Sequence, residues 1–231
     1  MKKIVVLSGA GISAESGIST FRDSNGLWEN QRIEDVATPD GWNANPKLVL
    51  EFYNQRRKQL FEVEPNEGHK SLVKLEDFYD VQIVTQNVDD LHERAGSSNV
   101  LHLHGELKKV RSTIDHNLVY DLDHWELKSG DKCENGSQLR PHIVWFGEAV
   151  PNIMLAEENI RKADVLIIVG TSLNVYPAAG LVDLIKEGTK VYIVDPADVT
   201  VNGVENITVI KAGAVEGLAE LVNELSSSEQ Y

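Results

Sequence analysis

The chain has 231 residues, 42% of them hydrophobic, and carries 22 basic against 36 acidic residues, which gives a formal net charge of −14. That length is enough to bury one good-sized core, and the acidic balance argues against a surface that binds nucleic acid, because phosphate contacts need clustered lysine and arginine. No stretch approaches the roughly 20 apolar residues of a membrane span, and the single cysteine, Cys133, rules out an internal disulfide. We therefore expect a cytoplasmic, monomeric protein with no membrane segment.

Six apolar runs have the composition of strands that are buried on both faces of a parallel sheet. In chain order they are residues 4–7, 81–85, 100–103, 165–169, 191–194 and 207–210. Helical patterns lie between or after them, at residues 67–78, 89–95, 154–162, 178–186 and 213–225. Because strand and helix alternate, the sequence predicts an α/β fold with a doubly wound, Rossmann-like parallel sheet.

Two segments, residues 27–63 and 107–143, break this alternation and are predicted to pack together as a small second lobe. We expect a single domain over residues 1–231, whose large lobe comprises about 1–26, 64–106 and 144–231. A ligand should bind between the lobes, at the carboxyl ends of the strands, where Gly9, Gln86, His104 and Gly170 would gather.

The first strand leads directly into the segment 9–23, which begins Gly-Ala-Gly-Ile-Ser-Ala. Gly9 and Gly11 allow a sharp turn and a close approach of backbone to ligand, and Ala14 completes the G-x-G-x-x-A spacing of dinucleotide sites. Tight strand-to-helix turns also need glycine for packing, so the triplet alone is a weak signal. A Rossmann oxidoreductase would continue into a helix and a second strand, whereas residues 20–26 read as a polar loop, which suggests a flap over a cofactor.

The whole segment resembles the signature of the sirtuins, the NAD-dependent protein lysine deacylases, and further motifs occur in that family's order. They are Thr85-Gln86-Asn87-Val88-Asp89, His102-Leu103-His104-Gly105-Glu106, Val144-Trp145-Phe146-Gly147-Glu148, and Gly170-Thr171-Ser172 with Pro177-Ala178-Ala179. Two positions depart from the family pattern, since Ser19 stands for the usual proline and Asp195 for the usual asparagine. The resemblance implies an enzyme that uses NAD as co-substrate and acylated lysine-containing proteins or peptides as partners.

His104 lies just past the end of a predicted strand, and an imidazole there is suited to proton transfer near neutral pH. The pattern alone leaves a hydrogen-bonded structural histidine equally open. The resemblance makes His104 the catalytic base and implies covalent capture by substrate, in which the acyl-lysine amide oxygen attacks C1′ of the nicotinamide ribose and expels nicotinamide. His104 then activates a ribose hydroxyl, and the products would be free lysine, nicotinamide and 2′-O-acyl-ADP-ribose.

Asn87 and Asp89 also follow a predicted strand, where short polar side chains can bind ribose hydroxyls, a carboxamide or a water, although Asp89 could simply cap the next helix. The resemblance places both at the nicotinamide end as catalytic residues. It also implies a set of cofactor-binding residues: Gly9, Ala10, Gly11, Ser13, Ala14, Phe21, Arg22, Gln86, Gly170, Thr171, Ser172, Asp195 and Ala214.

Asp195 ends a predicted strand and could accept hydrogen bonds from adenosine ribose hydroxyls while repelling a 2′-phosphate, which favours NAD over NADP. A plain turn before Pro196 is the alternative for this residue.

The acylated peptide is expected to bind by strand addition along a short extended segment that contains Val144, Phe146, Gly147 and Glu148. For Trp145, within this segment, a buried structural role applies at least in part.

The helical run 46–63 indicates which acyl group on lysine the enzyme would accept. Arg56 lies on the same face of this run as an apolar stripe made of Val49, Phe52, Tyr53 and Leu60. Tyr53 and Arg56 are spaced i, i+3, so a hydroxyl and a guanidinium can converge on one anion. An ordinary ion pair with Glu51 or Glu62, or a snorkelling side chain, is the alternative. The pair resembles the Tyr-x-x-Arg of sirtuins that remove succinyl groups, and Ala37 matches the small residue that widens their acyl pocket.

The family commonly carries two Cys-x-x-Cys pairs that hold a structural zinc in the segment corresponding to residues 107–143, where only Cys133 remains. Tetrahedral zinc needs four ligands, and His116, Asp121, His124 and Asp131 are irregularly spaced. We therefore predict a lobe without zinc or another metal, with a small apolar core made of Tyr120, Leu122, Trp125 and Leu127.

The sequence leaves two alternatives to a deacylase with activity on succinyl-, malonyl-like and acetyl-lysine. The first is an NAD glycohydrolase or ADP-ribosyl transferase that uses the same pocket with water or another nucleophile. The second is a non-catalytic nucleotide-binding module, and the joint presence of His104, Asn87 and Asp89 argues against it, because binding alone requires no base.

Overall fold

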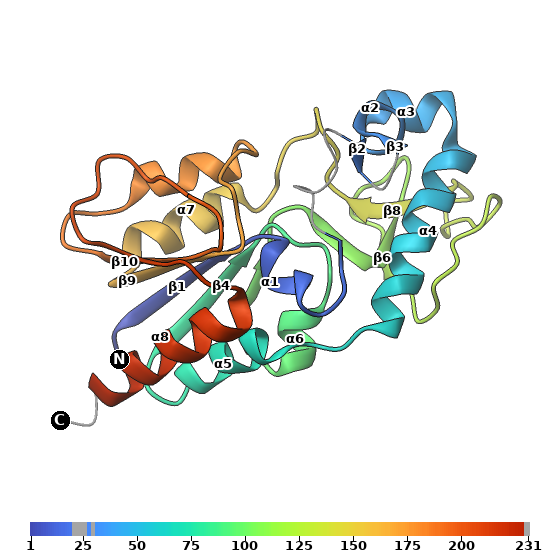
Figure 1. The fold of residues 1–231 in the computed structure, drawn as a ribbon. Coiled ribbons are helices and arrows are strands. Elements are labelled where there is room, and N and C mark those ends of the chain that lie inside the picture. The colour runs from blue at the N-terminus through green and yellow to red at the C-terminus, as the bar shows by residue number, and fades with distance from the viewer. Residues whose placement is uncertain (20–26, 29–30, 229–231) are drawn as a thin grey trace.

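The computed structural model describes residues 1–19, 27–28 and 31–228. At its centre lies a parallel sheet of six strands in the order β11-β10-β9-β1-β4-β5 (Figure 1). In chain order these are β1 (Lys3–Ser8), β4 (Asp80–Thr85), β5 (Val100–His102), β9 (Val165–Val169), β10 (Lys190–Val194) and β11 (Ile207–Ile210). Each strand begins and ends within one residue of its predicted range, and the predicted fold class is confirmed.

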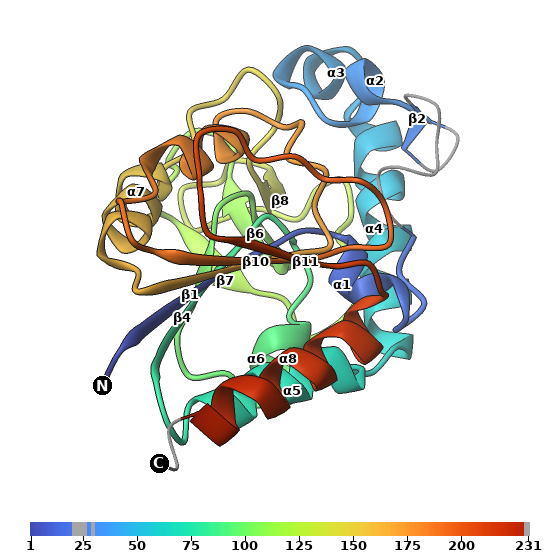
Figure 2. The same ribbon diagram turned by 60° about the vertical axis from the view of Figure 1, so that its left-hand side comes forward.

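Helices cover both faces of the sheet (Figure 2). On one face lie α5 (Glu67–Leu75), α6 (Leu91–Ala95) and α8 (Ala214–Ser228), and on the other lies α7 (Ile153–Lys162). Neighbouring residues of β1 point to opposite faces, so Val6 packs with Leu218 of α8 while Leu7 packs with Ile160 of α7. Burial on both faces explains why the strands are continuous apolar runs in the sequence. Among the described residues no helix combines the length and the apolar character needed to cross a membrane.

The helix predicted at residues 178–186 is wrong in type and length. The chain instead forms η2, a 3-10 helix at Ala178–Leu184, which packs on the same face of the sheet as α7. Gly180 lies near its centre, and glycine is a poor α-helix former, whereas short 3-10 turns are common as connectors. The other predicted helices are present, with ends that differ by up to three residues.

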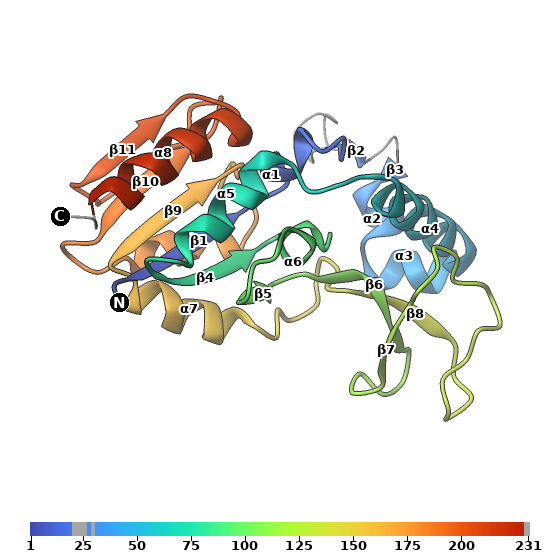
Figure 3. The same cartoon turned by 90° about the horizontal axis from the view of Figure 1, so that it is seen from below.

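A second group of elements stands beside the sheet (Figure 3). It contains an antiparallel sheet in the order β7-β6-β8 and a two-stranded sheet. Its members are β2 (Leu27–Trp28), β3 (Gln31–Arg32), α2 (Ile33–Val36), α3 (Pro39–Ala44), α4 (Pro46–Glu62), β6 (Gly105–Ser112), β7 (Val119–Asp121) and β8 (Leu139–Ile143). α4 begins with a proline in its first turn and is capped by the Asn45 side chain, which accepts from the Leu48 amide. The division of the chain into one domain with these two lobes stays a prediction.

The small apolar core predicted beneath β7 differs from expectation in one residue. Leu127 is buried with Leu50 and Val110, and Tyr120 and Leu122 pack against this cluster. Trp125 is 40% exposed, and the Lys58 ammonium lies 5.7 Å from its ring centroid. The prediction is wrong for Trp125, whose ring stays outside the apolar cluster. Its backbone is held instead, because the Trp125 carbonyl accepts a hydrogen bond from the buried Arg57.

Two strand-end turns meet at the carboxyl edge of the large sheet. The turn after β1 is α1 (Gly11–Ala14), and the turn after β9 contains Gly170 in the left-handed region, with φ +61°. The Gly11 amide donates to the Gly170 carbonyl at 2.8 Å, and the Gly9 amide donates to the Val169 carbonyl at 3.0 Å. A Cβ on Gly170 would overlap the backbone of Gly11 and the amide nitrogen of Ile12. The two turns therefore touch through bare backbone.

Gly170→Ala is expected to lower the free energy of unfolding by about 2 kcal/mol more than Gly188→Ala does. Both glycines have a positive φ, but a Cβ on Gly188 would meet no atom within 4 Å, so only the first variant adds an overlap of backbone with side chain. In a thermal melt the difference corresponds to about 4–8 °C for a chain of this size. Equal losses in the two variants would show that the close contact between the turns is not the limiting constraint.

Candidate functional site

A cavity of about 620 Å³ opens at the carboxyl edge of the large sheet, beside the small lobe. Of the predicted site residues in the described part of the chain, all line this cavity except Ser13. Phe21 and Arg22 lie outside the described residues. The cavity therefore brings together residues of the predicted catalytic, cofactor and substrate groups: His104, Asn87, Asp89, Gly9, Ala10, Gly11, Ala14, Gln86, Gly170, Thr171, Ser172, Asp195, Ala214, Ala37, Tyr53, Arg56, Val144, Phe146, Gly147 and Glu148.

The end of the cavity at β9 and β10 is held by polar contacts between strand ends. The Gln86 side chain donates to the Thr171 hydroxyl at 2.9 Å, which ties the end of β4 to the end of β9. One oxygen of the buried Asp195 accepts from the Ala197 amide at 2.9 Å, so the turn that the sequence offered as an alternative is present. Glu15, beside α1, accepts from the Val215 amide in the first turn of α8, where a carboxylate is favoured by the helix dipole.

His104 has a defined protonation pattern. Its Nδ1 lies 3.0 Å from the Gln86 carbonyl oxygen, which can only accept, so Nδ1 carries the proton and the lone pair is on Nε2. Burial lowers the pKa of His104, and the bond to Gln86 offsets this only in part. At neutral pH the ring is therefore a neutral base.

Asn87 and Asp89 are linked through Ser13. The Ser13 hydroxyl donates to Asp89 Oδ2 at 3.0 Å and accepts from the Asn87 side-chain nitrogen at 3.2 Å. Ser13 was predicted to bind cofactor, but it is fully buried and lies outside the cavity lining, where it fixes its two neighbours. Asp89 Oδ1 accepts from the Leu91 amide at 3.2 Å, and burial raises the pKa of Asp89. Asp89 therefore binds the first amide of α6, whose N-cap residue is Asp90, and also lines the cavity.

Two fully buried histidines that sequence reasoning missed lie next to this group. His92 Nε2 is 2.9 Å from the Ser8 hydroxyl, and His69 Nε2 is 3.5 Å from the Ser13 hydroxyl. The two rings pack edge to face, with centroids 5.0 Å apart. Burial lowers the pKa of His69 to about 4 and that of His92 well below its usual range, so both are neutral. The only signal in the sequence was a histidine on each of two predicted helices.

The opposite end of the cavity is formed by α4 and the segment after β8. Tyr53 is fully buried, and its hydroxyl oxygen accepts a hydrogen bond from Trp145 Nε1 at 3.0 Å. Burial raises the pKa of Tyr53, so the phenol keeps its proton. The Arg56 guanidinium lies 4.5 Å from the ring centroid of Phe52. Apolar residues such as Leu107, Ile143 and Val150 complete the lining, and sequence reasoning missed them because they carry no chemical signal.

The extended segment predicted through residue 148 is wrong beyond its first residues. β8 ends at Ile143, and residues 146–147 form a turn, in which Gly147 has φ +91°. The carboxylate of Glu148 imposes this turn, since it accepts from the Trp145 amide at 2.8 Å and from Arg140 and Arg111. Burial would raise the pKa of Glu148, but the bond from Arg140 outweighs it and the pKa is lowered. Glu148 therefore shapes the cavity wall as an ionised residue.

The comparisons with known proteins agree in one family. The sequence model of the Sir2 family matches residues 9–177. A protein of Bacteroides thetaiotaomicron named NAD-dependent protein deacylase is 55% identical over 226 residues, which cover 96% of this chain and 97% of that protein.

Two solved structures support the same relationship. A Sir2 homologue in complex with NAD aligns with a TM-score of 0.88 at 39% identity, covering 98% of this chain and 90% of that one. A mutant Sir2 homologue in complex with 2′-O-acetyl-ADP-ribose aligns with a TM-score of 0.90 at 37% identity, covering 100% and 94% of the two chains. The chain therefore belongs to the Sir2 family, the sirtuins.

Proposed function

We propose that this chain, which is an NAD-dependent protein deacylase of the Sir2 family, removes succinyl and malonyl-like groups, as well as acetyl groups, from lysine. Membership of the Sir2 family and the relative named a deacylase support the NAD-dependent reaction. The observation that carries the acyl preference is the placement of Tyr53 and Arg56 in the same cavity as His104. The expected products are free lysine, nicotinamide and 2′-O-acyl-ADP-ribose.

The residues of the large lobe fit NAD. A Cβ on Gly9, Gly11 or Gly170 would overlap the neighbouring turn, so these glycines let the turns after β1 and β9 touch at the edge of the sheet where we place the pyrophosphate. Asp195 and Ala214 line the part of the cavity near β10 and α8, where we place the adenosine. NAD supplies the ribose carbon and hydroxyl that together take the acyl group from lysine.

The chain's own part in the reaction centres on His104. Because Nδ1 donates to the Gln86 carbonyl, the ring is held in one tautomer and one orientation, with Nε2 ready to take a proton from a ribose hydroxyl. Ser13 holds the Asn87 and Asp89 side chains against each other, and we propose that this pair binds the nicotinamide end and a water.

His104→Ala is expected to reduce deacylation of an acetyl-lysine peptide by at least about a hundredfold, the lower range for loss of a general base. NAD affinity, measured by calorimetry, should change by less than about threefold, because Nδ1 is bound to the protein itself. The exposed His116 provides the control, since His116→Ala should leave both quantities unchanged. Unchanged turnover in the His104 variant would remove this residue from the mechanism, and nicotinamide release without any acylated peptide would favour the glycohydrolase alternative.

The acyl group binds, in this proposal, between Tyr53, Arg56 and Ala37. The Tyr53 hydroxyl oxygen accepts from Trp145 Nε1, and Tyr53, Arg56 and Ala37 all line the cavity. A succinyl carboxylate would accept from this phenol and from the Arg56 guanidinium, which would hold the acyl chain in place. The carboxylate is remote from the reacting amide, so these bonds are uniform binding and act mainly on KM.

Arg56→Met should raise KM for a succinyl-lysine peptide at least about tenfold, the value of one charged hydrogen bond, and leave acetyl-lysine kinetics within about threefold. Lys47→Met is the matched control, because it removes the same charge from an exposed position on α4 and should change neither substrate. The measurement is KM and kcat from steady-state kinetics with the succinyl-lysine and the acetyl-lysine peptide. Equal losses on succinyl- and acetyl-lysine would mean that Arg56 is structural and that the acyl preference is wrong.

We also propose that the small lobe holds no zinc. Cys133 Sγ lies 3.1 Å from the Ser137 hydroxyl, which is 2.7 Å from the Ser112 hydroxyl. A thiol with two neutral hydroxyls is not a ligand set that zinc uses in structural sites. The residues instead bond to one another, which supports a lobe that folds through its own hydrogen bonds and the apolar cluster around Leu127.

We propose acylated proteins, and not nucleic acid or a membrane, as partners of a monomer in the cytoplasm. The net charge of −14 argues against nucleic-acid binding, and the single cysteine agrees with a reducing compartment.

A further inference from the structure

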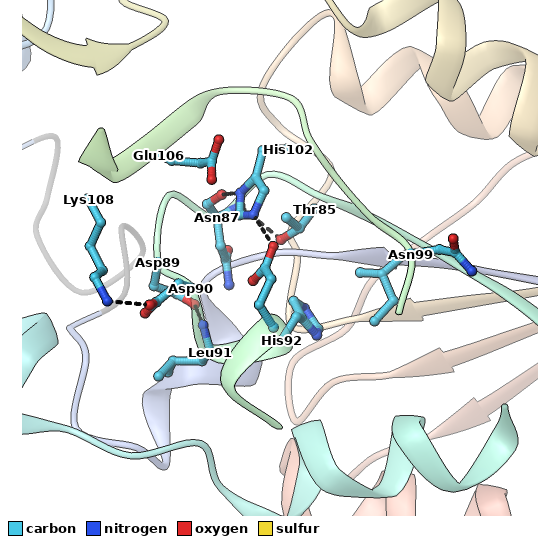
Figure 4. A network of polar contacts seen from close by, with 12 residues as sticks. Thr85, Asn87, Asp89, Asp90, Leu91, His92, Asn99, His102, Glu106 and Lys108 are labelled. Atoms are coloured by element: carbon cyan, nitrogen blue, oxygen red, sulfur yellow. Dashed lines mark hydrogen bonds and ion pairs between the residues drawn. The ribbon is translucent and has the colours of Figure 1, made fainter. Parts of the chain in front are cut away.

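Two histidines of the His-Leu-His sequence at the end of β5 form hydrogen bonds with backbone carbonyls of the loop that follows β4. His102 Nδ1 lies 2.9 Å from the Asn87 carbonyl oxygen (Figure 4). His104 Nδ1 lies 3.0 Å from the Gln86 carbonyl oxygen. Two histidines two residues apart thus bind the carbonyls of two consecutive residues. Only His104 has a role in the reaction as described so far.

The second nitrogen distinguishes the two rings. His102 Nε2 lies 2.8 Å from Glu93 Oε1, and the His102 side chain is 8% exposed. A carbonyl and an ionised carboxylate only accept hydrogen bonds, so both nitrogens of His102 must donate. Glu93 keeps 40% of its side chain exposed, which favours its ionised form. The ring of His102 is therefore an imidazolium, whereas that of His104 is neutral.

We infer that His102, as an imidazolium paired with Glu93, is a positioning residue that fixes Asn87 for the reaction of NAD. The inference rests on the proposed place of Asn87 at the nicotinamide end. Asn87 is held at three points: its carbonyl by His102, its amide by the Thr85 hydroxyl at 3.0 Å, and its side chain by Ser13. Of these bonds the one from His102 is charge-assisted and hence the strongest.

Loss of one proton would break this arrangement. A neutral imidazole has a single N–H, so either the Asn87 carbonyl or the Glu93 carboxylate would face a lone pair. If the remaining proton were on Nε2, Asn87 would keep only its neutral bonds to Thr85 and Ser13; if it were on Nδ1, the bond to the Asn87 carbonyl would remain but would lose the charge that strengthens it.

Charged and titratable groups from several elements act on His102. Burial lowers the pKa of His102, but the bond and charge of Glu93 on α6 outweigh it, Glu106 on β6 adds to them, and the pKa is raised. Glu106 is itself paired with Lys109 at 2.9 Å. The charge of His102 in turn favours the ionised form of Asp89 and disfavours protonation of His92.

The opposite directions of the pKa shifts of His102 and His104 define a pH window. His102 gains a partner in the folded chain, so its charge is complete below its unfolded pKa of about 6.5 and is lost as the pH rises through the raised folded value. The lowered pKa of His104 keeps that ring neutral to below pH 6.5. A neutral base and a charged positioning residue therefore coexist around neutral pH, and NAD use should fall on the alkaline side as His102 loses its proton.

The first test is nitrogen NMR of the imidazole rings in the unmodified chain, without ligand. At pH 7 the His102 signals should show two protonated nitrogens and those of His104 one. The His102 signals should titrate above about pH 6.5. A singly protonated His102 ring at pH 7 would overturn the inference, and because this measurement needs no turnover, it is independent of the proposed function.

The second test compares Glu93→Gln with Glu157→Gln, a control that removes a partly exposed helical carboxylate paired with Arg161 on α7. Glu93→Gln should move the alkaline limb of kcat/KM for an acetyl-lysine peptide down by about one pH unit, the low end for loss of a close opposite charge. Glu157→Gln should leave the limb in place. Equal profiles in the two variants would overturn the positioning role.

His102→Gln keeps one donor for the Asn87 carbonyl but cannot titrate. We expect about a tenfold loss of kcat/KM at pH 7, the value of a charged bond, and no alkaline limb from this site. NAD affinity is measured by calorimetry across the same pH range, so that a variant without turnover still gives a result. The affinity should fall with rising pH in the wild type and in Glu157→Gln, and it should fall at a lower pH in Glu93→Gln. An unaltered limb in His102→Gln, with a normal melting curve, would contradict the inference.

Discussion

The backbone contact between the turns after β1 and β9 is the constraint on which the rest of the site depends. Gly11 donates to the Gly170 carbonyl, and Gly170 in turn donates its amide to Val194 at the end of β10. Three strand ends are therefore joined in one line of backbone hydrogen bonds, with no side chain between the first two. At this edge Gln86, Thr171 and His104 line a single cavity.

The sequence predicted the large sheet well because its central strands β1, β9 and β10 are buried on both faces, so their apolar runs have clear ends. It was weaker where a segment owes its shape to a distant partner. Glu148 turns the chain after Trp145 because Arg111 and Arg140 reach it, and nothing near residue 148 indicates those two arginines. For motif-borne residues such as His104, the resemblance predicted their place in the cavity, since they stand at fixed positions within the motif.

Buried polar residues that meet across elements were missed for the same reason. His69 and His92 lie on different helices; His92 contacts Ser8 at the end of β1, and His69 contacts Ser13 in the turn after it. His102 was seen in the sequence, but its partner Glu93 lies on α6 and cannot be recognised from spacing alone. Arg140 stacks on the ring of Trp145, which holds Tyr53, so the acyl end also depends on residues outside any motif.

The strand order has a consequence for folding. β1, from the first residues of the chain, lies between β4 and β9, whose sequences begin about 75 and 160 residues later. Contacts between such distant segments form late and cooperatively, and the cavity has walls from all of them. A truncated chain that lacks β9 would leave β1 as an open edge and have no cavity to bind a nucleotide. Occupation of the cavity should accordingly slow amide hydrogen exchange throughout the central strands and not only in the loops that touch the ligand.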